Sequence, residues 1–272
     1  MTSRYLTAAR LRGLEEALAG RDYAVLACVA ELRFVTGGQL ARRCFAGPAH
    51  PAGDARAARR ALLRLVQLDV LARLPRSVGG VRAGSAGFVY HLGPVGQRLA
   101  TDRGWIAGRR FRRSHTPGLL FVRHTLLVAE LHTQLHEAAR ARAFDLIELA
   151  SEPACWRSVP GGSPPLKPDS YLRIGLGDFE FVYFVEVDRG TEGSRAIERQ
   201  LRLYTSYFRS GVEQAKRGVF PRVLWLSTSP RRVSVLAGLL GGLAEEDREL
   251  FAVVPFDAGV SFVAGDGSDP RE

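Results

Sequence analysis

Three carboxylates stand close together in one short and mostly apolar stretch of the chain. In LKPDSYLRIGLGDFEFVYFVEVDRG, residues 166–190, Asp169 follows a proline and the longest apolar run ends in Glu186-Val-Asp188. Side chains two residues apart leave the same face of a β-strand, so Glu186 and Asp188 are expected on one face. Carboxylates in this arrangement can bind a divalent cation, and the three residues are therefore candidate catalytic and metal-ligating groups.

A β-hairpin is the element that would bring these acids together. We expect residues 168–174 to pair with residues 180–188 around a turn at 175–179, which makes Asp169 face the neighbourhood of Glu186. Like charges so placed repel each other, and burial raises the cost to several kcal/mol. A hard divalent cation with oxygen ligands relieves that repulsion. The sequence therefore predicts Mg²⁺ or Mn²⁺ held beside a phosphate, where it would activate water.

Two other interpretations of the same acids stay open. Arg173, Arg189 or Arg195 could pair with them in a structural ion-pair network. Alternatively, Asp188-Arg189-Gly190 could simply end a strand and open a helix.

Basic residues are concentrated in the first part of the chain. Residues 1–118 contain 20 Arg and 7 acidic residues, whereas residues 119–272 contain 18 basic and 21 acidic residues. A positive field of this size attracts polyanions, and double-stranded DNA is the expected partner. The excess of 36 Arg over 2 Lys points to GC-rich coding DNA, which explains the choice of Arg over Lys but not the asymmetry.

Residues 1–104 have the pattern of a winged helix-turn-helix domain. Apolar spacing predicts helices over 21–35, 37–45 and 54–71, followed by two short strands around a Gly-rich tip. In this fold the third helix enters the DNA major groove and the hairpin touches the flanking backbone. The expected DNA contacts lie on these two elements: Arg56, Arg59, Arg60, Arg64, Arg73, Arg76 and Arg82. Winged helices also bind proteins, and that alternative stays open.

The remainder of the chain alternates helices and strands. Helices are expected over 119–142 and 191–211 and from Ser229-Pro230 onward, and strands over 144–153, 168–174, 180–188, 221–229 and 250–256. This order predicts a second domain over residues 119–262, of α/β class with a mixed sheet. Residues 105–118 are expected to be a basic linker, and residues 263–272 a disordered tail.

The composition argues against several classes of protein. No run of 18 uncharged apolar residues occurs, so a membrane span is not expected. The three cysteines have no metal-like spacing, which favours a reducing cytoplasm over a disulfide framework.

Three motifs of the second domain resemble the replication-relaxation family of bacterial, plasmid-associated proteins. They are KPD (167–169), FVEVDRGTE (184–192) and IERQLRLYTSYF (197–208). The segment RDYAVLACVAELRFVTGGQLARRCF matches the winged-helix start of that family, so the resemblance covers most of residues 20–230. It implies a restriction-endonuclease-like α/β fold of the PD-(D/E)xK type, related to plasmid mobilisation relaxases, and a role in plasmid replication or DNA relaxation.

The resemblance also implies roles for particular acids. Asp169 corresponds to the Asp of the PD element, and Glu186 to the acidic residue on the next strand, both binding the metal. Glu130, in the long helix, or Glu152, after the preceding strand, would supply a further acid.

The sequence departs from the family pattern at the basic residue. Asp188 stands where nucleases of this fold place a Lys, and Gln200 stands where the family moves that Lys. Arg199 or Arg202 could substitute for its charge, but Arg is too basic to accept a proton. Relaxases can use Tyr as a nucleophile, although the inward helical spacing of Tyr204 favours core packing. Two hypotheses follow: a metal-dependent DNA-nicking enzyme, and a non-catalytic replication or transcription factor whose second domain is a scaffold for dimerisation or partner docking.

Overall fold

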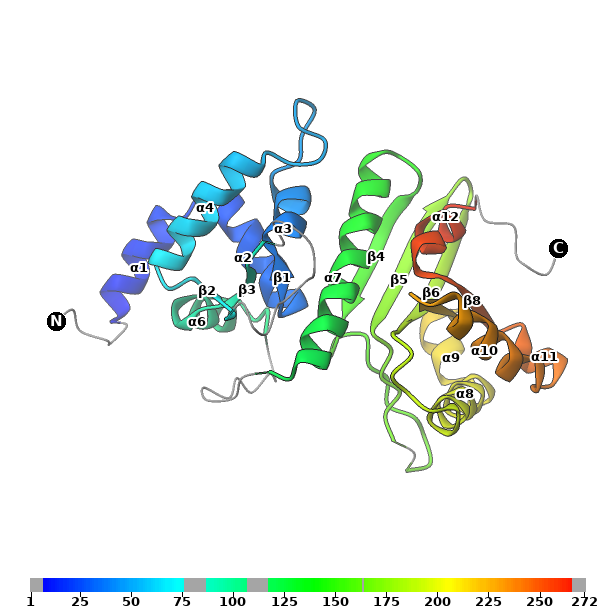
Figure 1. Cartoon of the computed structure of the whole chain (residues 1–272). Coiled ribbons are helices and arrows are strands. Elements are labelled where there is room, and N and C mark those ends of the chain that lie inside the picture. Colours follow the sequence, from blue (N-terminus) through cyan, green and yellow to red (C-terminus); the bar gives the residue numbers. More distant parts are fainter. Residues whose placement is uncertain (1–6, 76–86, 107–116, 163, 266–272) are drawn as a thin grey trace. The chain divides into compact units, whose positions relative to one another are not determined.

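The structure, a computed structural model, describes four stretches of the chain: residues 7–75, 87–106, 117–162 and 164–265. The chain divides into two compact units, residues 1–133 and residues 134–272 (Figure 1). The division falls inside helix α7 (Leu119–Arg140) rather than in the linker expected at 105–118, most of which lies outside the described residues. The reason is that Val122 and Ala129 of α7 are buried with side chains of the first unit.

The first unit combines helices with a small antiparallel sheet. Its elements are α1 (Ala8–Ala17), α2 (Gly20–Leu32), β1 (Val35–Thr36), α3 (Gly37–Cys44), α4 (Ala55–Gln67), β2 (Leu71–Arg73), β3 (Val89–Leu92), α6 (Pro94–Asp102) and the first part of α7. The strands are ordered β1-β3-β2, and both pairings are antiparallel. The predicted helices are present, whereas α1 and the two-residue strand β1 were not predicted.

Helix ends in the first unit are fixed by side chains that accept backbone hydrogen bonds. Thr36 and Gln39 form a capping box, because Gln39 N–H donates to Thr36 Oγ1 at 3.2 Å and Thr36 N–H donates to Gln39 Oε1 at 2.9 Å. Thr36 is therefore the N-cap of α3. The side chain of Asp54 caps α4 by accepting hydrogen bonds from the backbone N–H groups of Arg56 and Ala57. The two caps set where the helices start and hence which faces they bury.

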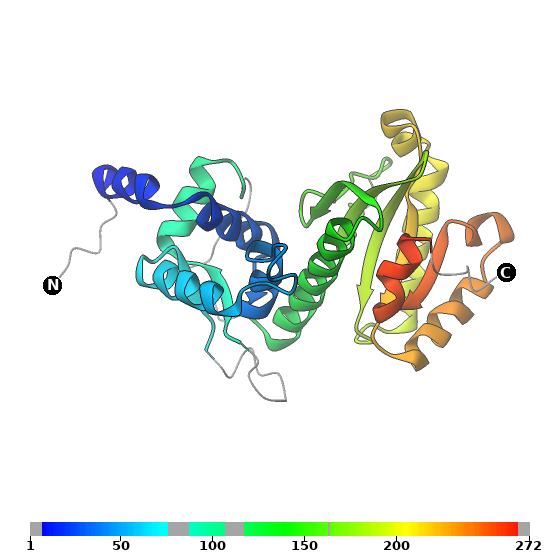
Figure 2. The same ribbon diagram turned by 90° about the horizontal axis from the view of Figure 1, so that it is seen from above.

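The second unit is an α/β domain built on a mixed sheet. Five strands are ordered β4-β5-β6-β7-β8: β4 (Asp145–Ser151), β5 (Ser170–Leu176), β6 (Phe179–Asp188), β7 (Arg222–Ser227) and β8 (Phe251–Pro255). The first three are antiparallel neighbours and the last three are parallel. The helices are α8 (Ser194–Arg209), α9 (Val212–Arg217), α10 (Pro230–Gly241), α11 (Glu245–Arg248) and α12 (Gly259–Val263). The predicted α/β class and mixed sheet are confirmed, and Figure 2 shows the sheet with its helices.

One face of this sheet packs against α8 and α10. Phe184 of β6, Trp225 of β7 and Phe251 of β8 are buried together with apolar side chains of the two helices. Tyr204 of α8 lies at the centre, with its ring centroid 5.9 Å from that of Phe184 and 6.2 Å from those of Trp225 and Phe251. Tyr204 therefore joins α8 to strands β6, β7 and β8 through ring contacts.

The hairpin between β5 and β6 has a tighter turn than expected. Leu176 pairs with Phe179, so the turn consists of residues 177 and 178 instead of 175–179. Gly177 has a φ of 58°, a conformation that glycine adopts without steric cost. At the other end Ser170 pairs with Val185, which places Asp169 next to Glu186.

Candidate functional site

Three acidic residues of the second unit lie at neighbouring strand ends. Glu152 follows β4, Asp169 precedes β5, and Glu186 lies near the end of β6. Because Ser151 pairs with Ser170, the residues just beyond this pair are also neighbours. Carboxylate oxygens of Glu152 and Asp169 lie within 4.8 Å of each other. We call Glu152, Asp169 and Glu186 the acid cluster.

Asp169 is fixed to the backbone of β6. Its Oδ2 accepts a hydrogen bond from Val187 N–H at 2.7 Å, and its own N–H donates to Val185 O at 3.0 Å. The side chain is buried, with 8% of its surface exposed. Asp169 thus prolongs the β5–β6 ladder by one residue and carries its carboxylate to the buried end of β6.

Glu186 is buried and is bonded mainly to neutral groups. Burial raises its pKa well above the usual glutamate value, and the negative charge of Asp169 raises it further. Hydrogen bonds from Tyr204 and Gln200 act in the opposite direction, and Tyr204 Oη–H donates to Glu186 Oε1. The carboxyl group is therefore protonated more readily than that of an ordinary glutamate, and a positive charge placed beside it would favour ionisation.

Cys155 lies against the acid cluster and was not anticipated as a neighbour. It is fully buried, and its thiol donates to Pro168 O at 2.9 Å. Burial is the main cause of its raised pKa, followed by the charges of Glu152, Asp169 and Glu186. All three carboxylates therefore act on one sulfur, which stays a protonated thiol and is a poor nucleophile.

Asp188 does not join the acid cluster. Arg232 of α10 binds it, with Nε 2.5 Å from Oδ2, and Gly190 N–H donates to Oδ1 at 2.9 Å. Both carboxylate oxygens of Asp188 therefore already have partners within the second unit. The guanidinium neutralises Asp188 at the strand end, so we assign it a structural ion pair. None of the arginines considered from the sequence is this partner; Arg173, for example, pairs with Glu180.

Comparison with known proteins identifies the family of this chain. The model of the family described as Replication-relaxation matches residues 26–223, which is more than half of the chain. The chain belongs to the replication-relaxation family. No curated protein and no solved structure matched the chain. Membership suggests a role in plasmid replication or relaxation. Among the described residues, we find no helix with the length and apolarity that crossing a bilayer requires.

Gln200 occupies the place where the sequence comparison located the missing basic residue. In this replication-relaxation protein its side chain hydrogen-bonds to the carboxyl group of Glu186. An amide supplies no positive charge, so it does not offset the repulsion between Glu186 and Asp169. Position 200 thus contributes no positive charge to the acid cluster.

Glu130 belongs to the first unit and has a packing role there. It accepts hydrogen bonds from Arg42 Nη1 at 2.6 Å and from Gln39 Nε2 at 3.0 Å. Gln39 Nε2 also donates to Leu126 O at 3.0 Å, so these contacts join α3 to α7. These contacts give Glu130 a packing role, and its expected catalytic role stays a prediction.

The predicted DNA-contacting arginines differ in how they are held. Arg56, Arg59, Arg60 and Arg64 are exposed on α4. Arg64 Nη2 binds Asp22 Oδ2 at 2.5 Å. This ion pair joins α4 to α2 and compensates part of the positive charge of Arg64. The guanidinium of Arg73 lies 4.1 Å from the ring centroid of Phe88. Arg76 and Arg82 lie outside the described residues.

Proposed function

We propose that this replication-relaxation protein binds duplex DNA through its first unit, which is a winged helix. The order α2-β1-α3-α4-β2-β3 with sheet order β1-β3-β2 supports this assignment. It makes α4 the third helix, the one that enters the major groove in winged helices. The proposal places this binding in plasmid replication or relaxation, the role suggested by the family.

The proposal of DNA binding rests on the two faces of α4, one buried and apolar and the other exposed and basic. Ala58, Leu62 and Leu65 are buried in the core of the first unit. Arg56, Arg59 and Arg60 are exposed on the same helix. A helix anchored on one side and basic on the other can lie on a phosphate backbone without losing its packing. Arg64 and Arg73 already have partners and contribute less.

A salt titration tests this proposal. The variant Arg56→Gln/Arg59→Gln/Arg60→Gln should bind duplex DNA more weakly. Its slope of log affinity against log salt should be shallower by about 2.7, or about 0.9 for each lost phosphate contact. A matched variant, Arg10→Gln/Arg12→Gln/Arg98→Gln, removes three exposed arginines from other parts of the same unit. Unchanged affinity and slope in the α4 variant would remove this helix as the DNA-contacting element.

We propose as a second function that the acid cluster holds Mg²⁺ or Mn²⁺ for nicking of DNA. Carboxylate oxygens are the ligands that these hard cations prefer. The raised pKa of Glu186 reflects burial and a neighbouring negative charge, and a divalent cation would relieve both penalties. Glu152, Asp169 and Glu186 would be the ligands. When bound, such a cation polarises a phosphodiester and lowers the pKa of bound water.

The competing function is DNA binding without catalysis. Tyr204 and Gln200 already hydrogen-bond to Glu186, and no Lys stands at the expected place to stabilise developing negative charge. In this alternative the acid cluster is a remnant, and the second unit serves as a scaffold for dimerisation or partner docking.

Two measurements separate the alternatives. Supercoiled plasmid incubated with the protein and Mn²⁺ should be nicked, and Asp169→Asn or Glu186→Gln should abolish nicking. Independently, Mn²⁺ at about 100 times its dissociation constant should stabilise the folded protein by about 2.7 kcal/mol. That shift should be lost in the same variants and kept in Glu180→Gln, an acid at an exposed site. Intact plasmid with no Mn²⁺-dependent shift supports the non-catalytic alternative.

A further inference from the structure

Helix α8 presents an arginine-rich face to solvent. Its buried side includes Ile197, Leu201 and Tyr204. On the opposite side the sequence repeats at intervals of four, three, four and three residues, which keeps side chains on one helix face. We call this the outer face of α8; its residues are all exposed: Arg195, Arg199, Arg202, Ser206 and Arg209.

The outer face is positively charged, whereas the part of the chain that contains it has more acidic than basic residues. Residues 119–272 contain 18 basic and 21 acidic residues, yet the outer face holds four Arg and no acid. Glu198 lies at its edge and is half-buried. A helix face that is only solvated commonly mixes both signs, whereas this one concentrates positive charge in an otherwise acidic part of the chain.

The arginines of the outer face differ in their existing partners. Arg209 Nη2 binds both carboxylate oxygens of Asp247, at 2.7 and 2.9 Å, so its charge is compensated. The guanidinium groups of Arg195, Arg199 and Arg202 form no ion pair with any residue that the structure describes. These three side chains therefore supply the uncompensated charge of the outer face.

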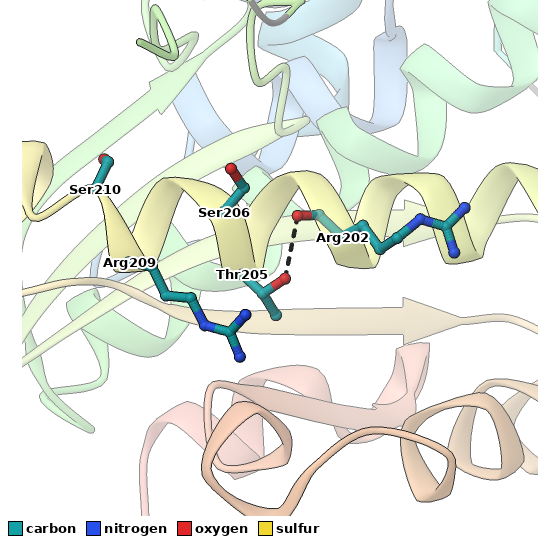
Figure 3. Close-up of a pocket in the computed structure, with 5 residues that line it drawn as sticks. All are labelled: Arg202, Thr205, Ser206, Arg209 and Ser210. Carbon is teal, nitrogen blue, oxygen red and sulfur yellow. Dashed lines mark hydrogen bonds between the residues drawn. The ribbon is translucent and has the colours of Figure 1, made fainter. Parts of the chain in front are cut away.

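A hollow of about 470 Å³ lies along the second half of α8 (Figure 3). It is lined by Arg202, Thr205, Ser206, Arg209 and Ser210. The hydroxyl of Thr205 donates to Arg202 O at 3.1 Å, and that of Ser210 donates to Tyr207 O at 2.6 Å. The guanidinium of Arg202 and the hydroxyl of Ser206 remain as donors for a ligand. These groups suit phosphate oxygens, which accept strong hydrogen bonds from arginine.

We propose that the outer face of α8 binds the phosphate backbone of duplex DNA, as a second contact surface besides α4. This proposal rests on the DNA-binding function proposed above. Arg195 and Arg202 are seven residues apart, which corresponds to about 10 Å along a helix axis. One DNA strand carries a phosphate about every 3.4 Å along the helix axis, so a span of about 10 Å covers about three phosphate steps and each arginine can meet a separate phosphate. Contacts of this kind fix the position of the DNA without reading its sequence.

The position of the outer face defines its role. Tyr204 and Gln200 leave α8 toward Glu186, whereas the arginines leave it toward solvent. A phosphate held by the arginines is therefore on the other side of the helix from the acid cluster. The outer face is an anchoring surface for DNA, and its loss should weaken binding without changing the chemistry available at the acid cluster.

The test uses the full-length chain and a short duplex of mixed sequence. We expect Arg195→Gln/Arg199→Gln/Arg202→Gln to reduce the salt slope of binding by about 2.7, or about 0.9 for each phosphate contact. Between about 50 and about 200 mM salt, the wild-type chain should then lose about 40-fold more affinity than the variant. Fluorescence anisotropy measures both quantities, and thermal unfolding verifies that the variant is folded.

A control variant separates a binding surface from a general effect of charge. Arg140→Gln/Lys216→Gln/Arg231→Gln removes three exposed positive charges from other parts of the second unit. It should leave the salt slope within about one of the wild-type value. Equal losses in the two variants, or no loss in the α8 variant, would overturn the proposal. If the wild-type chain binds DNA and only the α4 variant is impaired, this inference fails alone; if the wild-type chain does not bind DNA, the proposed function fails as well.

Discussion

Glu213 is the buried charge whose removal should cost the second unit most. This side chain of α9 is fully buried, and Arg157 Nε lies 3.1 Å from each of its carboxylate oxygens. Tyr207 Oη–H donates to the same carboxylate at 2.6 Å. Arg157 is two residues from Cys155, whose thiol pKa is raised by the charges of the acid cluster. The substitution Glu213→Ala therefore tests what holds this segment in place.

The structure sets the expected size of the effect. Removing one partner of a buried ion pair costs about 3–5 kcal/mol, because the other charge stays buried. Arg157 keeps hydrogen bonds from Nη1 to Cys155 O and Trp156 O, at 2.9 and 3.3 Å, which places the ion-pair loss at the lower end. Tyr207 loses its acceptor, worth about 1 kcal/mol. We expect the free energy of unfolding to fall by about 4 kcal/mol and the melting temperature by about 10 °C.

Urea unfolding at neutral pH measures the change, and the second unit provides a matched control. Arg173 and Glu180 form an ion pair at 2.7 Å, with side chains 38% and 52% exposed. Glu180→Ala should cost less than about 1 kcal/mol, because water replaces the lost contact. Glu213→Gln, which keeps the shape of the side chain, should fall between the two and remains informative if Glu213→Ala does not fold. A loss for Glu213→Ala as small as that for Glu180→Ala would refute the reasoning.

Three further predictions concern other acids. Because burial and a neighbouring carboxylate raise the pKa of Glu186 in the folded state, its contribution to stability is complete below an ordinary glutamate pKa of 4.5 and is lost as pH rises through the raised value. Glu186→Gln should remove this loss, so urea midpoints of variant and wild type should diverge with rising pH; parallel curves would contradict this. Asp188→Asn should cost about 3 kcal/mol by leaving Arg232 without its carboxylate, yet leave any Mn²⁺-dependent thermal shift intact. Loss of that shift would return Asp188 to the metal site. Asp22→Ala removes both the acceptor that caps α2 and the partner of Arg64, and should cost about 1–3 kcal/mol in urea unfolding; no change would show that neither contact matters.

The regular elements follow from local patterns in the sequence. Ile197, Leu201 and Tyr204 recur at helical spacing and are buried on α8 as expected. The apolar run and the turn that predicted β5 and β6 also predicted that Asp169 would neighbour Glu186. Such patterns suffice because each element buries a continuous side of its own sequence. Short helices such as α9, with only six residues, repeat too little to be predicted.

Charge pairing was not predictable, since it depends on how distant elements cross. Asp188 and Arg232 are 44 positions apart, and the parallel pairing of β6 with β7 brings the start of α10 to the end of β6. Nearer arginines were equally plausible partners from the sequence alone. Likewise, nothing in the spacing of Glu130 indicated its contacts with Arg42 and Gln39. The acids could be found from the sequence, but their division into structural and functional groups could not.

The buried acids of the second unit differ in the charge of the side chains that bind them. Asp188 and Glu213 are each bound by an arginine, so their negative charge is compensated within the protein. Glu186 instead receives hydrogen bonds from Tyr204 and Gln200, which are neutral, while Asp169 repels its charged form. The same unit thus uses arginine at Asp188 and Glu213, and neutral donors at Glu186. An arginine beside Glu186 would occupy the place that the proposed cation needs, whereas neutral donors orient the carboxyl group without compensating its charge. The absence of a Lys at position 200 removes a group that would stabilise developing negative charge during cleavage, but it leaves the three proposed cation ligands, Glu152, Asp169 and Glu186, in place.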